Sequence, residues 1–282
     1  MLGRPVAYRL LQEGYRVRVL THSPSRAETF FDSQFEIHTG DVTDPESLKG
    51  PMQGCSAVYV NLGAKYDIEK YDLVEFRGTV NIAEAAKEAG IERIGMISSN
   101  RVESSDTGVA YLDAKAKAEQ ALKDSGVPYT VFKCCWFFES LPLFIQGGKA
   151  IVLGKQSNPL FWIATSDYAG MVARSFETEE AANRSLYIKG VTQLSIPDAL
   201  NRFCEIVIPD AKLSYIPLWL AKLATFFTRK KQMKGLVEFM DYFDKNEEPG
   251  VSGEAERILG PALTTIEDWC EDYKQRLEMM RK

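Results

Sequence analysis

Residues 93–97 (RIGMI), 110–124 (AYLDAKAKAEQALKD) and 130–133 (TVFK) form a strand–helix–strand pattern. The two short runs are mostly apolar, whereas the middle run is long and consists mainly of good helix formers. Parallel strands need a crossover of this kind, because a tight turn joins only antiparallel strands. The pattern therefore predicts a βαβ unit within a parallel sheet.

The same alternation continues on both sides of this unit. Earlier in the chain, it predicts helices at 4–13, from Ser23-Pro24 onward and at 73–89, and strands at 15–20, 35–39 and 57–62. Later short strands are predicted at 151–153, 161–164, 186–188 and 213–215. Ser195 with Asp198, and Thr264 with Glu267, predict the N-termini of two later helices.

We expect an α/β fold with a Rossmann-like, doubly wound parallel sheet. Residues 1–150 would form the nucleotide-binding core. Residues 151–282 would complete the sheet and add a small substrate lobe. No Pro/Gly/Ser-rich linker separates the two parts, so we expect one intertwined unit.

The first predicted helix begins at Gly3 with no strand before it. In a Rossmann-like sheet the first strand is central, and the glycine turn after it presents backbone N–H groups to a pyrophosphate. We interpret residues 1–6 as the tail of that turn, with Gly3 as its last glycine; the alternative is an ordinary helix-entry glycine. The interpretation predicts about ten upstream residues that supply a strand and a Gly-x-x-Gly turn.

Composition excludes several classes of protein. The chain has 282 residues and a net charge of −5, which argues against nucleic acid as a partner. Its five cysteines are scattered without a CxxC pair, which indicates a reducing compartment without disulfides. Its two histidines lie near no second ligand, so we expect no metal site. With no recognisable secretory signal, we predict a cytoplasmic location.

The pattern Tyr-x-x-x-Lys occurs three times, at Tyr66, Tyr111 and Tyr129. Only Tyr111 and Lys115 fall at the start of a helix that follows a core strand, where residues four apart share one face. A nearby ammonium would lower the pKa of the phenol and suit it to proton transfer. Ser98 or Ser99, at the end of the preceding strand, could donate a hydrogen bond to a reacting carbonyl.

Three segments carry a family resemblance. Residues 111–130, the run Gly40-Asp41-Val42-Thr43-Asp44 and residues 81–90 resemble the NmrA-like group of atypical short-chain dehydrogenases. The resemblance covers most of residues 3 to about 200. It implies an NAD(P)-binding domain that reduces a carbonyl or double bond, with Tyr111 as the acid/base and Lys115 as its tuner and ribose ligand.

The same resemblance assigns further cofactor contacts. It implies that Asp41 and Val42 flank the adenine and that Leu62 and Gly63 line the dinucleotide. The family usually has Arg-Pro where this chain has Lys133-Cys134, so the contacts near the nicotinamide differ. Many members of the group have lost the tyrosine and only sense the dinucleotide. The alternatives are therefore a reductase of a small apolar carbonyl or enone and a non-catalytic redox sensor or assembly protein.

The end of the strand predicted at 15–20, which would be the second strand of a complete Rossmann-like sheet, bears on the choice of cofactor. NAD sites place a carboxylate there, but residues 20–26 (LTHSPSR) contain none. We therefore predict NADP, with NAD as the alternative, and with Arg26 and His22 on the additional phosphate. The other interpretation of Arg26 is a solvated helix residue.

Aromatic side chains gather after the strand at 130–133. They could line an apolar substrate pocket or simply pack in the core; they are Trp136, Phe137, Phe138 and Trp162. For the adjacent Cys134 and Cys135 we favour core packing over a redox pair.

Residues 216–234 combine an apolar helix with a basic end. One interpretation is a surface helix that contacts a membrane. The favoured interpretation is a lid helix buried on the substrate lobe. The oligomeric state is not predicted.

Overall fold

Four parallel strands form the central sheet of the computed structural model. The model describes residues 2–103, 106–228, 231–249 and 253–281. The sheet order is β10-β5-β4-β3. Its strands are β3 (Ala57–Val60), β4 (Arg93–Ser99), β5 (Tyr129–Cys134) and β10 (Arg184–Ile188). Every residue of β4 is buried, as expected for a strand covered on both faces.

A second parallel pair lies at the N-terminal side of the fold. The strands β1 (Arg18–Thr21) and β2 (Glu36–Thr39) pair in register from Arg18–Glu36 to Thr21–Thr39. Within the described residues, they form a ladder separate from the four-stranded sheet. The expected α/β fold with a Rossmann-like parallel sheet is confirmed.

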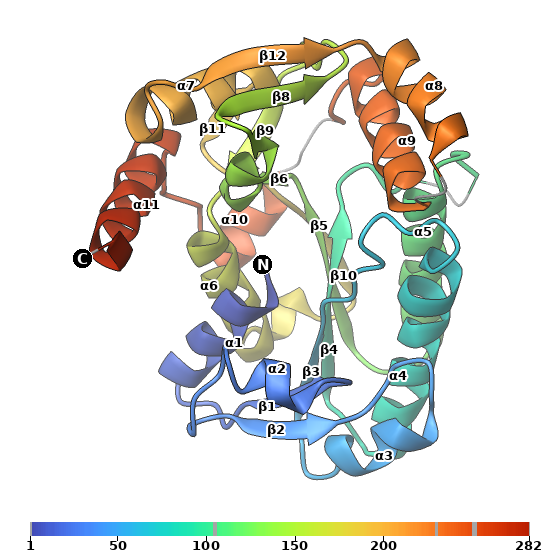
Figure 1. Cartoon of the computed structure of the whole chain (residues 1–282). Coiled ribbons are helices and arrows are strands. Elements are labelled where there is room, and N and C mark those ends of the chain that lie inside the picture. The colour runs from blue at the N-terminus through green and yellow to red at the C-terminus, as the bar shows by residue number, and fades with distance from the viewer. Residues whose placement is uncertain (1, 104–105, 229–230, 250–252, 282) are drawn as a thin grey trace.

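Helices cover both faces of the four-stranded sheet (Figure 1). On one face lie α4 (Gly78–Glu88) and α5 (Ala110–Asp124), and on the other lie α1 (Gly3–Gln12) and α6 (Thr165–Glu177). The short helices α2 (Pro24–Ala27) and α3 (Glu46–Met52) lie beside β1 and β2, and η3 (Glu179–Ala181) follows α6. The prediction of one regular helix at 73–89 is wrong at its start, because a π-helix, η1 (Tyr71–Arg77), precedes α4.

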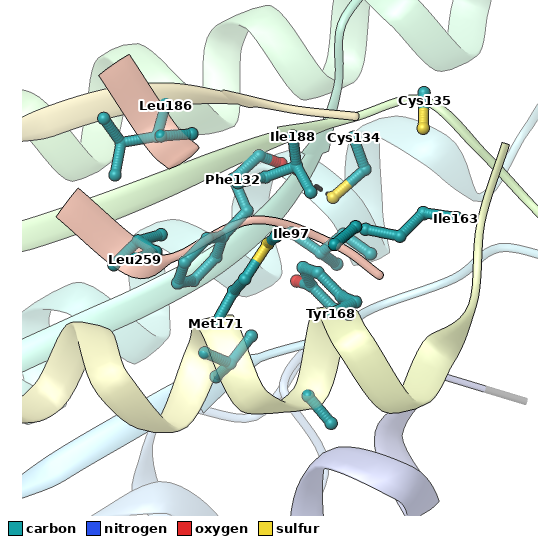
Figure 2. Packing of buried hydrophobic residues seen from close by; sticks show 14 of the residues in the cluster. Ile97, Phe132, Cys134, Cys135, Ile163, Tyr168, Met171, Leu186, Ile188 and Leu259 are labelled. Carbon is teal, nitrogen blue, oxygen red and sulfur yellow. Dashed lines mark hydrogen bonds between the residues drawn. The ribbon is translucent and has the colours of Figure 1, made fainter. Parts of the chain in front are cut away.

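The core on the α6 face lies between α6 and strands β4, β5 and β10. Figure 2 shows Phe132, Leu186 and Ile188 from the sheet facing Tyr168 and Met171 on α6. A separate buried cluster fills the α4–α5 face and includes Ile82, Ile94 and Leu122. These two layers hold the carboxyl ends of the strands in fixed positions.

The C-terminal part adds two small three-stranded sheets. Their orders are β11-β9-β6 and β12-β8-β7. The strands are β6 (Trp136–Phe137), β7 (Ile145–Gln146), β8 (Lys149–Leu153), β9 (Leu160–Ile163), β11 (Thr192–Leu194) and β12 (Lys212–Ile216). The remaining helices are η2 (Phe138–Phe144), α7 (Ile196–Val207), α8 (Leu218–Phe227), α9 (Lys231–Lys245), α10 (Glu254–Leu259) and α11 (Ile266–Arg281).

The two predicted helix caps have different outcomes. Ser195 caps α7 as expected, because its hydroxyl accepts the backbone N–H of Asp198 at 3.2 Å. The cap of α11 lies one residue later than predicted. Thr265, rather than Thr264, accepts a backbone N–H bond, from Asp268 at 3.1 Å.

Candidate functional site

The N-terminus of α1 lies beside the carboxyl end of β3. A Cβ added to Gly3 would come within 3.0 Å of Nδ2 of Asn61, the residue after β3. No side chain caps this helix, and its first turn carries no acidic residue. Its first backbone N–H groups therefore suit a phosphate, for which an uncapped helix N-terminus has both donors and a favourable dipole.

The ends of β2 and β3 converge on the start of α4. Val42 and Leu62 both lie against Gly78, where an added Cβ would contact each of them within 3.3 Å. Gly63 is exposed, and no atom lies within 4 Å of the Cβ it lacks. Gly63 thus borders open space, and the sequence predicts that Leu62 and Gly63 line a dinucleotide.

His22, Arg26 and Asp41 lie on the β1–β2 side of this region. All three are exposed, and His22 and Asp41 are close enough for the imidazole to influence the carboxylate. Hydrogen bonds from the N–H and hydroxyl of Thr43 hold the pKa of Asp41 below its usual range. Arg26 on α2 and His22 after β1 are therefore free to meet an anionic group in solvent.

Tyr111 is the second residue of α5 and lies among aromatic rings. Its ring meets Tyr71 of η1 edge-on at 5.6 Å between centroids, and Phe239 of α9 at 5.5 Å. Burial raises the pKa of Tyr111 well above its usual value of 10.0, and the charge of Glu75 raises it further. This direction is opposite to the one expected from a nearby Lys115 ammonium.

Lys115 is committed to a buried carboxylate. Its Nζ lies 2.8 Å from Oε2 of Glu75 and donates to the carbonyl oxygen of Ile97 at 3.1 Å. The side chains of Lys115 and Glu75 are only 5% and 1% exposed. The other oxygen of Glu75 accepts the backbone N–H of Ala64 at 3.2 Å. Glu75 therefore joins α5 to the loop that follows Leu62 and Gly63.

Sequence reasoning missed Glu75, although a signal was present. Glu75 falls on the same stripe as Thr79, Ile82 and Ala86, which are all buried. A carboxylate on the core-facing stripe of a helix needs a charged or hydrogen-bonding partner, because an unpaired buried charge is costly. Lys115 is that partner.

Ser98 and Ser99 point to opposite faces of β4, as successive strand residues do. Ser98 donates from its hydroxyl to Oε1 of Glu119 on α5 at 2.5 Å. Oγ of Ser99 accepts the backbone N–H of Arg101 at 3.2 Å. Lys133, at the family's arginine position, lies 3.6 Å from Glu119 and joins the network of Ser98. The side-chain hydrogen bonds of both serines are thus made with residues other than Tyr111.

The four aromatic residues proposed for substrate contact belong to packed clusters. Phe138 and Trp162 are fully buried and stack at 6.2 Å, Phe137 packs against Tyr168, and Trp136 is partly buried beside Trp162. Their contacts favour the core-packing interpretation.

Cys134 and Cys135 are also buried, and burial raises the pKa of both thiols. Figure 2 shows Cys134 pointing toward Tyr168 and Ile163. Neither cysteine is disulfide-bonded. A buried thiol with a raised pKa is a poor nucleophile, so core packing accounts for this pair.

The expected lid helix is not buried, and that interpretation is wrong. Of the residues in α8, only Ala221 is buried, while Trp219 is 67% exposed and Phe226 is 84% exposed. Arg229 and Lys230, part of the basic end noted in the sequence, lie outside the described residues.

An uncapped helix N-terminus that starts with a glycine, beside the carboxyl end of a parallel strand, is the arrangement expected of a dinucleotide-binding α/β protein. A family model described as NAD(P)H-binding matches residues 1–168. The chain belongs to this NAD(P)H-binding family, and the predicted class of cofactor is confirmed. The resemblance to the atypical, NmrA-like dehydrogenases is confirmed at this level.

Several relatives match nearly the whole chain. The photosystem II assembly factor Ycf39 of Trieres chinensis is 27% identical over 289 residues, covering 98% of this chain and 90% of the relative. Ycf39 of Cyanophora paradoxa is 24% identical with the same coverage.

Solved structures share the fold at low sequence identity. Triphenylmethane reductase of Citrobacter sp., complexed with NADP(H), superposes with a TM-score of 0.74 at 17% identity. The NADPH-dependent quinone oxidoreductase of Escherichia coli, complexed with NADPH, gives 0.76 at 17% identity. In both comparisons the match covers 97% of this chain and 96% of the other.

Proposed function

We propose that this chain is an NADP(H)-binding protein that supports the assembly of a protein partner and does not turn over a substrate. The observation that carries the proposal is the buried Lys115–Glu75 ion pair. An ammonium held by a carboxylate and a carbonyl oxygen has only one of its three N–H groups left for a ribose hydroxyl. The tendency of the Lys115 ammonium to lower the pKa of Tyr111 is offset by the negative charge of Glu75.

The residues available for the cofactor support the binding part of the proposal. The first turn of α1, from Gly3, would hold the pyrophosphate, and Leu62 and Gly63 would line the dinucleotide. Asp41 and Val42 would flank the adenine, and Arg26 with His22 would meet the additional phosphate of NADP. The nicotinamide supplies a hydride when a suitable acceptor is present.

The protonation of Tyr111 supports the non-catalytic part. A phenol with a raised pKa remains protonated throughout the neutral range, and its proton is harder to transfer. The hydroxyl of Ser98 donates to Glu119, whereas Oγ of Ser99 accepts the backbone N–H of Arg101. Neither Tyr111 nor Ser98 is therefore tuned to protonate a developing alkoxide.

The descriptions of the relatives support the proposal that the partner is a protein. Two relatives that each cover 98% of this chain are described as photosystem II assembly factors, and we extend an assembly role to this protein. We retain a cytoplasmic location in the proposal, because all five cysteines are free.

A second candidate is an NADP-dependent reductase of a small apolar carbonyl or enone. It is favoured by the placement of Tyr111 and Lys115 on consecutive turns of α5. The catalytic set would be Tyr111, Lys115 and either Ser98 or Ser99. The substrate would lie against Trp136 and its aromatic neighbours.

The two candidates are separated by Tyr111→Phe, with Tyr129→Phe as the matched control. Tyr129 begins another Tyr-x-x-x-Lys match, but it lies on β5. Tryptophan fluorescence measures NADPH binding, and nicotinamide absorbance measures oxidation of NADPH with menadione or cyclohexenone as the acceptor.

We expect wild type and both variants to bind NADPH equally and to oxidise it no faster than a protein-free control. Oxidation by the wild type that is lost in Tyr111→Phe alone would establish the reductase instead. Absence of NADPH binding by the wild type would overturn the proposal at its first step.

A further inference from the structure

Helix α8 exposes a large apolar surface. Phe226 and Phe227 at its end are 84% and 82% exposed, and Trp219 near its start is 67% exposed. Leu220 and Leu223 are exposed on the same helix, and Tyr215 on β12 is exposed beside its start. A contiguous set of large exposed apolar side chains is typical of a protein or membrane contact. We call the exposed residues of 215–227 the α8 surface.

The charge around the α8 surface differs from that of the rest of the chain. Residues 212–234 contain six basic residues and no acidic residue, although the chain as a whole carries −5. The basic residues are Lys212, Lys222, Arg229, Lys230, Lys231 and Lys234. This concentration of positive charge favours an anionic partner.

Some of this charge is already paired within the protein. Lys222 lies 2.8 Å from Asp241, and Lys231 forms an ion pair with Glu69. Lys212 and Lys234 are exposed, and neither forms an ion pair within the part of the chain that the structure describes. Exposed positive charge therefore remains on the elements that precede and follow α8 in the sequence.

From this combination we infer that α8 docks in the plane of an anionic lipid bilayer, with Trp219, Phe226 and Phe227 inserted at the headgroup level. Aromatic side chains on an apolar helix with flanking lysines are the composition of an interfacial helix. A second copy of the chain fits less well, because a twofold contact through this surface would bring like-charged segments together. In the described residues, no helix has the length and apolarity needed to cross a membrane. The inference concerns a surface outside the dinucleotide site and goes beyond the proposed function.

The test is flotation of the full chain with vesicles at low salt. Vesicles of phosphatidylcholine alone are compared with vesicles of equal parts phosphatidylcholine and phosphatidylglycerol. The apolar variant is Phe226→Ser/Phe227→Ser, and its control is Leu263→Ser, which changes an apolar residue that is 75% exposed elsewhere. The charge variant is Lys234→Glu, with Lys87→Glu on α4 as its control. All five positions are exposed, so each variant is expected to fold.

We expect the wild type to float with the anionic vesicles and much less with the neutral ones. The double serine variant should bind at least about tenfold more weakly, because two aromatic side chains no longer enter the bilayer. Lys234→Glu should weaken binding and reduce its salt dependence, while both controls bind like the wild type. Failure of the wild type to float, or equal flotation of the double variant, would overturn the inference. Concentration-dependent dimerisation that the double variant abolishes, without flotation, would assign the surface to a second copy instead.

Discussion

Glu75→Gln gives the most direct test of how Lys115 is held. The substitution removes the charge of Glu75 but keeps an oxygen that can accept the N–H of Ala64. Lys115 would then retain only the carbonyl of Ile97, in a position where its side chain is 5% exposed. Removing one partner of a buried ion pair costs about 3–5 kcal/mol. Because the Ala64 hydrogen bond is preserved, we expect the lower end, about 3 kcal/mol of unfolding free energy.

Urea unfolding followed by tryptophan fluorescence measures this loss. For a slope near 3 kcal/mol/M, a loss of about 3 kcal/mol lowers the midpoint by about 1 M with the slope unchanged. The matched control is Glu179→Gln. Glu179 pairs with Arg93 at 3.8 Å, but its side chain is 99% exposed, and we expect a change below about 0.5 kcal/mol.

The double variant Glu75→Gln/Lys115→Met isolates the pair itself. It removes both charges, so it should recover most of the stability that either single variant loses. The reasoning is refuted if Glu75→Gln changes the unfolding free energy no more than Glu179→Gln does. Lys115 would then not depend on Glu75, and the ammonium would be available to a ribose, as the reductase requires.

Three further predictions concern other parts of the fold. Arg26→Glu should raise the Kd for NADPH far more than that for NADH, measured by fluorescence titration; equal effects would remove Arg26 from the phosphate site. The hydroxyls of Tyr59 and Tyr168 lie 2.9 Å apart, and burial raises the pKa of both phenols in the folded protein. Their contribution to stability should therefore be complete below about pH 10, the pKa of an unfolded tyrosine, and should be lost as the pH rises through the higher folded-state values. Urea midpoints across that range should fall steeply in the wild type and less steeply in Tyr59→Phe/Tyr168→Phe; parallel curves would contradict the assignment. Phe138→Ala should cost about 3–5 kcal/mol, because Phe138 is fully buried, while leaving NADPH binding unchanged once the variant is folded.

The strands and helices of the first half could be predicted because their signals are local. Apolar runs alternate with helix-forming runs, and the parallel sheet follows from the connections between them. The start of the helix predicted at 73–89 could not be obtained in this way. Apolar spacing does not distinguish a π-turn from an α-turn, and the difference appears only in the backbone hydrogen bonds of η1.

The shifted cap of α11 has an identifiable tertiary cause. Thr264 and Thr265 are both suitable cap residues by sequence. Asp167 on α6 accepts the N–H of Thr264 at 2.8 Å and its hydroxyl at 3.1 Å. Thr264 is therefore occupied, and Thr265 caps the helix with Asp268. A contact between residues nearly a hundred positions apart cannot be read from a four-residue pattern.

The candidate site shows the same limit of prediction from a local sequence pattern. The spacing of Tyr111 and Lys115 correctly predicts their shared helix, but spacing carries no information about the charge that faces them. Burial raises the pKa of Tyr111, and the charge of Glu75, which comes from another element, raises it further, opposite to the direction expected from Lys115. A motif defines which groups are near one another along a helix, and the fold determines their protonation.

The position of Glu75 also connects the dinucleotide region to the α8 surface through direct contacts. The loop after Leu62 and Gly63 binds Glu75 through Ala64, and two residues further Tyr66 lies against α9. Gly235 allows that approach, because any Cβ there would overlap the backbone carbonyl of Tyr66. α9 in turn holds α8 through the ion pair of Asp241 with Lys222. This loop and α9 therefore form a continuous series of contacts from the residues after β3 to α8.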